Sequence, residues 1–520
     1  MSSIYNKKNP EEDAKEGLSK ELSGDTVDLP KDLSPHSDML TLEKSPCLLK
    51  PIFLCVCISF GGFMFGWDVG TIGGITNMQS FQAYFGTITD PVTGLKRFPD
   101  LIIGLLISIF NIGCAIGGLT LAKLGDFKGR KLGIIAAIAV YWVGLQLQVI
   151  NHQKWLQFFF GRVVTGLAVG STAVLIPMFI SESAPTKIRG SMVVLYQLMV
   201  TLGILAGNII NYICLKSFSS QPNDNRQWQV PLLLGFAWSV IILVGLSFTP
   251  ESAQYLMLKR NDVQKAKRSF SLMNGIDEED EKTYEFIEES MREKQDMLKM
   301  GKQQGIFEFI TGKPKLGLRL LIGVLVMTFQ QLSGINYFFY YGTTIFERAH
   351  LDPYLTPIVL SGVNFGATFV GIYLVEALGR KSCLLLGSVG MFCCMMIYAS
   401  VGSFALESVS SAGIMTATTC VYIFFFATTL GPVTFVLVSE LFPMKTRATS
   451  MAICSSFNWL FNFAISLLTP TITSKIGFLY GYFFAGCLFL SALCVWILVP
   501  ETRNKTEADI NRIYECTNSE

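Results

Sequence analysis

Charged side chains are scarce in this chain of 520 residues. Lys and Arg together number 41 and Asp and Glu 39, so charged residues make up 15% of the sequence, whereas soluble domains have about 25%. Hydrophobic residues make up 51%, and the mean hydropathy is +0.45. These values exclude an ordinary soluble domain. The net charge of +2 provides no basic surface, so we expect no nucleic-acid partner.

Histidine is rarer still. His36, His152 and His350 are the three histidines, and all lie outside the apolar runs, so no metal site or proton relay through histidine is indicated. Most of the 13 cysteines lie inside apolar runs, which favours small core residues over disulfides or metal ligands. The sequence shows no nucleophile–base pair and no Walker loop. We therefore expect no enzyme activity, no cofactor and no metal.

A cleavable leader is also missing, because the first apolar run begins only near Pro51. The residues before it, 1–48, mix Lys, Glu, Asp, Ser and Pro with little periodicity. We expect them to form a disordered tail.

What the chain does have is long apolar runs. Each is about 20 residues long and is bounded by charged or turn residues, which is typical of membrane-spanning helices. The sequence therefore predicts an all-α polytopic membrane protein with twelve spans, near residues 51–73, 101–121, 132–150, 156–180, 190–214, 230–249, 318–345, 354–376, 383–402, 412–438, 447–470 and 479–499.

The distribution of positive charge predicts the orientation of these spans. Loops on the same side as the termini carry more Lys and Arg than the opposite loops, at Lys123, Lys128, Arg130, Lys131, Lys187, Arg189, Arg380, Lys381, Lys445 and Arg447. Both termini and the stretch 250–317 are therefore expected in the cytoplasm. Within that stretch, Asp262 to Lys299 is rich in Glu and Lys and predicts surface helices, although a solvated linker explains most of its composition.

Several motifs occur twice, about 250 residues apart. Gly129-Arg130-Lys131 returns as Gly379-Arg380-Lys381, and the spacing of Ser181-Glu182-x-x-Pro185-x-Lys187-x-Arg189 is repeated from Ser439 to Arg447. Pro250-Glu251-Ser252 returns as Pro500-Glu501-Thr502. Parallel repeats of this kind indicate two six-helix halves with a ligand site at their interface. We predict halves at 49–249 and 318–500, a cytoplasmic helical linker at 250–317 and a short cytoplasmic tail at 501–520.

The repeated charges lie where spans meet the cytoplasm. Opposite charges there can hold the halves together and separate when that side opens, or they can merely mark topology and cap helices. We favour gating ion pairs, because only that role explains the duplication in both halves. The candidates are Arg130, Glu182, Arg189, Glu251, Arg380, Glu440, Arg447 and Glu501.

Two ionisable residues lie deeper, Asp68 in the first span and Arg162 in the fourth. An isolated charge at that depth costs several kcal/mol, so we expect the two to pair. The pair is either a permanent structural ion pair or a proton switch, in which protonation of Asp68 releases Arg162 and couples transport to a proton gradient.

Side-chain amides gather in the apolar sequence from Phe329 to Tyr337. Gln330 and Asn336 would point about 120° apart on an ideal helix, but Gly334, preceded by Ser333, is a plausible point for the helix to kink or unwind. A broken helix would let Gln330, Gln331 and Asn336 converge. Other buried amides are expected in distant spans, at Gln197, Asn364, Asn458 and Asn462.

Amides donate and accept hydrogen bonds without carrying charge, as suits a polyhydroxyl solute. Flat faces for a sugar ring are available from Tyr337, Phe338, Phe435 and Trp459. For any single residue, helix–helix hydrogen bonding or ordinary aromatic packing explains its presence equally well. The collection favours a polar, neutral ligand.

Several motifs together make the chain resemble the sugar porter branch of the major facilitator superfamily, and within it the fungal hexose transporters. The resemblance covers about residues 50–505 and includes GFMFGWD at 62–68, SIFNIGC at 108–114, GDFKGRK at 125–131, YQLMVT at 196–201, QQLSGINY at 330–337, SELFP at 439–443 and PETR at 500–503. It implies the major facilitator fold and hexose transport by alternating access. It also implies a monomer in the plasma membrane, with a hexose and the lipid bilayer as its partners.

The resemblance also implies which residues bind the sugar. In this family the sugar is held largely by amides of the second half, which match Gln330, Gln331, Asn336, Asn364 and Asn458. Gln197 matches the main contact from the first half. Phe435 stands where family members usually carry Trp, and Leu430 where fungal relatives often carry Trp. These two departures concern residues near the sugar, so galactose, or a broad and weak hexose preference, is expected.

Two further departures lie outside the sugar site. Gln254 replaces the Arg of the usual Pro-Glu-Ser-Pro-Arg motif, and Gln229 stands at another position where relatives usually have Arg. Most close fungal relatives are uniporters, so we predict facilitated diffusion, with proton symport through Asp68 and Arg162 as the alternative. A non-transporting sugar sensor is disfavoured, because only about 20 residues follow Val499.

Overall fold

The computed structural model describes residues 49–89, 91, 94–150, 154–184, 189–218, 224–301, 308–348, 352–405 and 410–516. The expected disordered tail at 1–48 lies outside these residues. So does the segment 185–188, which contains Pro185 and Lys187 of the repeated motif.

The first half is a bundle of long apolar helices. Its spans are α2 (Leu49–Asn77), α4 (Asp100–Leu119), α6 (Arg130–Val149), α7 (Trp155–Ser183), α8 (Arg189–Ser217) and α9 (Arg226–Phe248). Three short elements connect them: α3 (Gln79–Phe85), an antiparallel pair of strands β1 (Ile88–Thr89) and β2 (Lys96–Arg97), and α5 (Lys123–Lys128).

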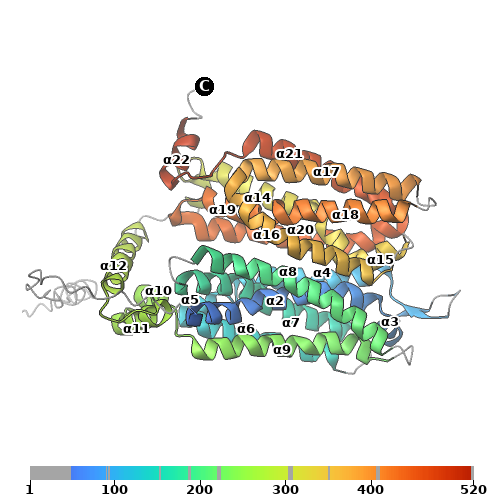
Figure 1. The fold of residues 1–520 in the computed structure, drawn as a ribbon, viewed down its shortest axis with the longest axis horizontal. Helices are drawn as coiled ribbons and strands as arrows, with labels where there is room; N and C mark the ends of the chain where they lie inside the picture. Colours follow the sequence, from blue (N-terminus) through green and yellow to red (C-terminus); the bar gives the residue numbers. More distant parts are fainter. Residues whose placement is uncertain are drawn as a thin grey trace, which may run out of the picture. The chain divides into compact units, whose positions relative to one another are not determined.

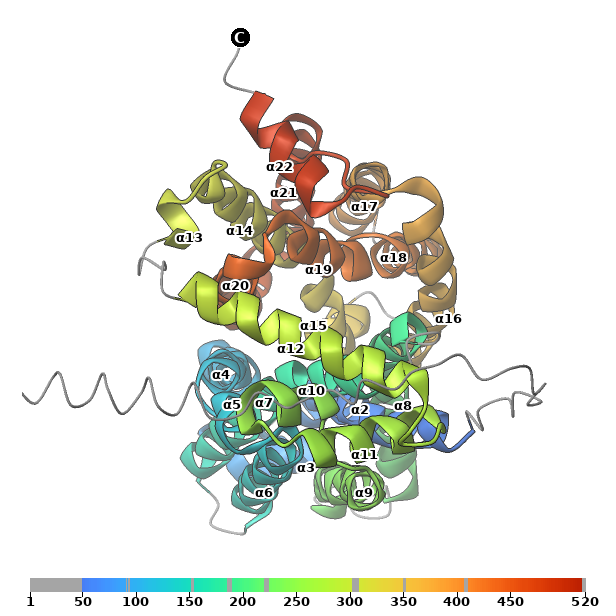
Figure 2. The ribbon, with the colours of Figure 1, turned by 90° about the vertical axis from the view of Figure 1, so that its left-hand side faces the viewer.

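The linker between the halves is helical. It contains α10 (Ala253–Tyr255), the π-helical turn η1 (Leu256–Arg260), α11 (Val263–Asn274), α12 (Glu281–Gly301) and α13 (Glu308–Thr311). The side chain of Asp262 caps α11 by accepting a hydrogen bond from the amide of Lys265, and Gly275 ends the helix in the left-handed conformation. We call the end of the bundle where α9 ends and α14 begins the linker end. Figure 2 views the molecule from this side.

The second half repeats the arrangement with two interruptions. Its helices are α14 (Leu316–Leu332), α15 (Ile335–Arg348), α16 (Leu355–Leu378), α17 (Arg380–Phe404), α18 (Ser411–Thr428), α19 (Leu430–Leu441), α20 (Met444–Ile476) and α21 (Tyr480–Leu498). A 3₁₀ turn, η2 (Gly477–Leu479), joins α20 to α21, and a terminal helix α22 (Glu507–Cys516) follows. Figure 1 shows α2–α9 gathered in one group and α14–α21 in another.

Twelve crossings follow from these helices. Among the described residues, eleven segments are long and apolar enough to span a membrane. The last of them, Thr449–Leu498, has 50 residues, far more than the roughly 20 that one crossing needs. It contains both α20 and α21 with the turn η2 between them, so it crosses twice. The predicted spans and their order are therefore present.

Small residues let the helices pack closely. A Cβ added to Gly113 on α4 would lie 2.5 Å from the carbonyl oxygen of Val163 on α7, and one added to Gly166 on α7 would lie 2.3 Å from that of Phe110 on α4. The two backbones therefore touch in a way that only glycine allows. This is the packing expected inside a membrane, where association of helices depends on close contact.

Candidate functional site

The seventh span is broken where the sequence predicts a break. Helix α14 ends at Leu332 and α15 begins at Ile335, and Gly334 between them has φ +91°. An added Cβ at Gly334 would lie 2.6 Å from the ring of Phe484. Both the conformation and the space require glycine at this position.

The break brings four amides together in one hydrogen-bonded chain. Asn336 Nδ2 donates to Gln331 Oε1 at 2.7 Å, Gln331 Nε2 donates to Asn458 Oδ1 at 2.9 Å, and Asn458 Nδ2 donates to Gln330 Oε1 at 2.8 Å. Asn336 also donates to Asn462 on α20 at 3.0 Å. We call these five residues the amide network. They belong to α14, α15 and α20, and the convergence expected of Gln330, Gln331 and Asn336 is present.

A second helix break, which the sequence analysis did not predict, adjoins the network. Helix α18 ends at Thr428 and α19 begins at Leu430, with Thr429 at φ −131° and ψ −86°. Gln330 Nε2 donates to the carbonyl oxygens of Leu430 and Gly431 at 3.0 and 3.1 Å. The available signal was Gly431-Pro432, because proline has no N–H to continue the helical hydrogen bonds.

The remaining predicted sugar contacts lie outside this chain of hydrogen bonds. Asn364 is buried on α16, and Phe435 on α19 is 44% exposed. Gln197 is exposed on α8, eleven residues before Asn208, which places both on nearly the same face of the helix. Asn208 Nδ2 donates to Ser361 Oγ on α16 at 2.9 Å. Gln197 therefore lies on the face of α8 that meets the second half.

The two halves meet at several points away from the linker end. Asn77 Nδ2 on α2 donates to Thr343 Oγ1 on α15 at 2.5 Å, and Thr344 Oγ1 donates to Asn77 Oδ1 at 3.1 Å. Tyr354 donates to the carbonyl oxygen of Gly74 at 3.3 Å. Sequence reasoning missed these contacts, since none of the residues is unusual at the end of a span. Deeper in the bundle, the rings of Trp459 on α20 and Phe65 on α2 meet edge to face, with centroids 5.8 Å apart.

The two deep charges form an ion pair. Arg162 Nη1 donates to Asp68 Oδ1 at 2.7 Å, and the two side chains are 2% and 3% exposed. The guanidinium also lies over the ring of Phe110, 4.5 Å from its centroid. Asp68 Oδ2 and Arg162 Nε are buried without a hydrogen-bond partner. The ion pair is therefore buried, and one polar atom of each side chain lacks a hydrogen-bond partner.

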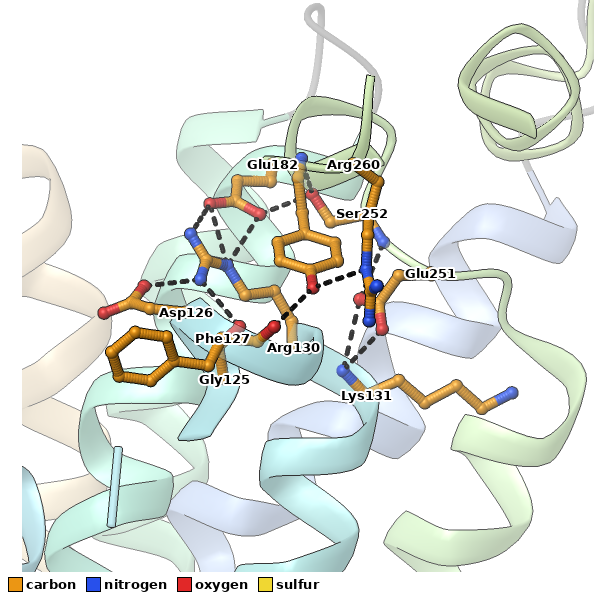
Figure 3. A network of polar contacts seen from close by, with 10 residues as sticks. Gly125, Asp126, Phe127, Arg130, Lys131, Glu182, Glu251, Ser252 and Arg260 are labelled. Atoms are coloured by element: carbon orange, nitrogen blue, oxygen red, sulfur yellow. Dashed lines mark hydrogen bonds and ion pairs between the residues drawn. The ribbon is translucent and has the colours of Figure 1, made fainter. Parts of the chain in front are cut away.

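At the linker end of the first half, Arg130 is the centre of a charged cluster (Figure 3). It pairs with Glu182 at 3.1 Å and with Asp126 at 2.6 Å. The hydroxyl of Ser252 donates to Glu182 as well. Glu251 accepts from the backbone amides of Lys131 and Ser252.

The second half repeats this cluster with its own residues. Arg380 pairs with Glu440 at 2.8 Å, and Thr502 Oγ1 donates to Glu440 at 2.6 Å. Glu501 accepts from the backbone amides of Arg380 and Lys381 at 2.9 and 3.1 Å. Partial burial raises the pKa of Glu501, but hydrogen bonds from backbone amides, including those two, outweigh it and hold the pKa below its usual value.

The Arg–Glu pair at the centre of each cluster lies within one half. Arg130 pairs with Glu182 of the first half and Arg380 with Glu440 of the second, whereas the gating prediction requires charges that meet across the halves. Arg447 pairs with Glu507 of α22 at 3.6 Å, and Arg189 is the first residue of α8. The gating role of these charges stays a prediction. Among the described residues, no three His, Cys, Asp or Glu side chains lie where they could hold a metal ion.

Comparison with known proteins covers nearly the whole chain. A family described as "Sugar (and other) transporter" matches residues 54–514. The hexose transporter HXT14 of Saccharomyces cerevisiae is 54% identical over 484 residues, which are 89% of each chain. A low-affinity glucose transporter of Kluyveromyces lactis is 42% identical, over 91% of this chain and 84% of its own. These proteins are transporters and not enzymes.

Solved structures share the fold. The inward-open xylose transporter XylE of E. coli aligns with a TM-score of 0.74 and 23% identity, covering 89% of this chain and 99% of its own. This likeness and the family match together confirm the predicted twelve-helix major facilitator fold.

Proposed function

The chain is a fungal sugar porter of the major facilitator superfamily, and on this basis we propose that it carries hexoses of the glucose type across a membrane. The mode of transport that we propose is alternating access. The observation that carries this proposal is the amide network, a set of uncharged donors and acceptors that converge at the break between α14 and α15 and reach the break between α18 and α19. The names of its relatives, which are hexose and glucose transporters, support it.

The network suits a neutral, polyhydroxyl solute. Gln330 is 4% exposed and Gln331 9%, and a buried amide needs partners for each of its donors and acceptors. Sugar hydroxyls supply both roles, so a bound hexose replaces the bonds that the amides make to one another. Gln197 and Asn364 provide further amides from α8 and α16, and Phe435 provides a ring face from α19.

We propose facilitated diffusion as the mode of transport, with both termini and the linker end in the cytoplasm of a plasma-membrane monomer. Proton symport is the second candidate, and one observation favours it. Asp68 Oδ2 is buried without a hydrogen-bond partner, so a proton could bind there and weaken the pair with Arg162. Galactose stays a candidate substrate, because Phe435 and Leu430 replace the Trp that relatives carry at these two positions.

The test is uptake of radiolabelled glucose, fructose, mannose and galactose in a host that lacks its own hexose carriers. We expect saturable uptake of at least one hexose, unchanged by an uncoupler. Uptake that the uncoupler abolishes, with alkalinisation of the medium when sugar is added, would favour symport. A protein that reaches the membrane and moves none of the four sugars would contradict the proposal.

A further inference from the structure

The break between α14 and α15 leaves the backbone carbonyl of Ser333 without its helical partner. In a continuous helix, the amide of Tyr337 would donate to the carbonyl oxygen of Ser333, four residues earlier. Here it donates to the carbonyl oxygen of Gly334 at 3.1 Å. Ser333 is fully buried, and a buried carbonyl without a partner is costly.

A side chain from another span satisfies this carbonyl. The hydroxyl of Tyr422, on α18, donates to the carbonyl oxygen of Ser333 at 2.7 Å. Tyr422 is 1% exposed and its ring packs against Phe338 of α15, with centroids 5.2 Å apart. The phenol is therefore held by packing at the position that the break requires.

The support between the two broken spans is reciprocal. Tyr422 reaches from α18 to the break after α14, and Gln330 reaches from α14 to the carbonyls of Leu430 and Gly431 just after the break between α18 and α19. Each broken span therefore supplies a side-chain donor to the backbone of the other at its interruption. A change at one break must strain or release the hydrogen bonds at the other.

We propose that Tyr422 is a positioning residue for sugar binding, which sets the geometry of the amide network through the Ser333 carbonyl. Gln331 lies before the break and Asn336 after it, yet their side chains are joined at 2.7 Å. The conformation of Ser333 and Gly334 decides whether these two amides face the same solute. Tyr422 fixes that conformation without being a member of the network. This inference rests on the proposed hexose transport.

Tyr398 on α17 is a matched control. It is also 1% exposed and packs edge to face on Phe338, with centroids 5.1 Å apart. Its hydroxyl lies 3.4 Å from the hydroxyl of Tyr337 and not at the break. Tyr422→Phe and Tyr398→Phe therefore remove the same atom from similar surroundings, and only the first removes the donor to the Ser333 carbonyl.

The first measurement is hexose uptake, normalised to the amount of protein in the membrane. We expect Tyr422→Phe to raise KM about tenfold, equivalent to about 1.4 kcal/mol, with the maximal rate within about twofold of wild type. Tyr398→Phe is expected to keep KM within about twofold. Equal KM changes in the two variants would overturn the positioning role. So would loss of Tyr422→Phe from the membrane while Tyr398→Phe accumulates, because that result indicates a role in folding.

The second measurement needs no transport. Hydrogen exchange of the purified proteins is followed in peptides that cover residues 330–339. We expect exchange there to quicken at least fivefold in Tyr422→Phe and to stay at the wild-type rate in Tyr398→Phe. Unchanged exchange in Tyr422→Phe would overturn the inference even if hexose transport is established. If wild type moves no hexose, the proposed function fails while the exchange result still decides whether Tyr422 holds the break.

Discussion

Gln331 is the central member of the amide network, since it accepts from Asn336 and donates to Asn458. Its loss removes both bonds and leaves the half-buried Asn336 and the buried Asn458 each with an unmet group. Gln330 has a different position, because it also donates to the backbone of α19. Members of the network therefore differ in their roles. Gln331 is placed to bind the sugar, whereas Gln330 also holds α19 in place.

We expect Gln331→Ala to lower kcat/KM for hexose uptake at least tenfold. One lost hydrogen bond costs about 1 kcal/mol and an unsatisfied buried partner about 1–3 kcal/mol, and a sugar bound at this site would lose a contact as well. Radiolabelled uptake, normalised to membrane protein, measures the change. The control is Gln148→Ala, which removes a buried glutamine of α6 that donates to Thr165 outside the network. Equal losses in both variants would contradict the site.

We expect Asp68→Asn to destabilise the protein by about 3–5 kcal/mol, because it leaves the Arg162 guanidinium buried without its carboxylate. The double variant Asp68→Asn/Arg162→Gln should recover much of that loss. The midpoint of thermal unfolding in detergent, measured for both single variants and the double variant, gives the coupling between the two residues. Additive effects would show that the pair is not held together as the structure indicates.

At the scale of helices, the sequence predicted one of the two breaks. Gly334 was recognisable because Ser333 and Gly334 interrupt an apolar helix between amides that could not otherwise converge. Thr429 gave a weaker signal, since the nearby Gly431-Pro432 is equally compatible with the first turn of a helix. The predicted spans match the observed helices closely because long apolar runs depend on local composition. The hydrogen bonds of Gln330 and Tyr422 join residues 89 to 101 positions apart, which no local pattern contains.

The terminal helix α22 is another element that the sequence analysis did not predict, since 501–520 was expected to be a short tail. Ile510 and Tyr514 are buried, and the ring of Tyr514 lies under the guanidinium of Arg319, 4.4 Å from its centroid. Burial raises the pKa of the Tyr514 phenol to about 12. Arg319 itself is fully buried, with Nε and Nη2 unpartnered. Tyr514 therefore covers Arg319 at the linker end of α14.

We expect Tyr514→Ala to release α22 from the bundle, because it removes both the buried ring and the cation–π contact, which together contribute a few kcal/mol. Limited trypsin digestion near Arg512 should then proceed about tenfold faster than in wild type. Glu515→Ala, at an exposed position of the same helix, is the control and should leave the rate unchanged. Equal digestion of wild type and Tyr514→Ala would show that α22 is held by other contacts.

At the scale of the whole molecule, alternating access requires the contacts away from the linker end to open in every cycle. Asn77 on α2 and Thr343 on α15 are side chains of opposite halves only 2.5 Å apart. Helix α15 also carries Asn336 at its first turn, so Thr343 and this member of the amide network lie on the same helix. When α15 moves away from Asn77, it therefore carries Asn336, a predicted sugar-binding residue, with it.

We expect the double variant Asn77→Cys/Thr343→Cys to lose hexose uptake on mild oxidation, by at least tenfold, and to regain it on reduction. A disulfide at this position joins the two halves covalently, and the transporter can then no longer open this end. Each single variant, treated in the same way, is the control for the 13 native cysteines, and electrophoresis after cleavage at an inserted protease site in the linker shows whether the halves are joined. Full uptake by protein whose halves are demonstrably joined would mean that this end stays closed throughout transport, and alternating access between these halves would be wrong.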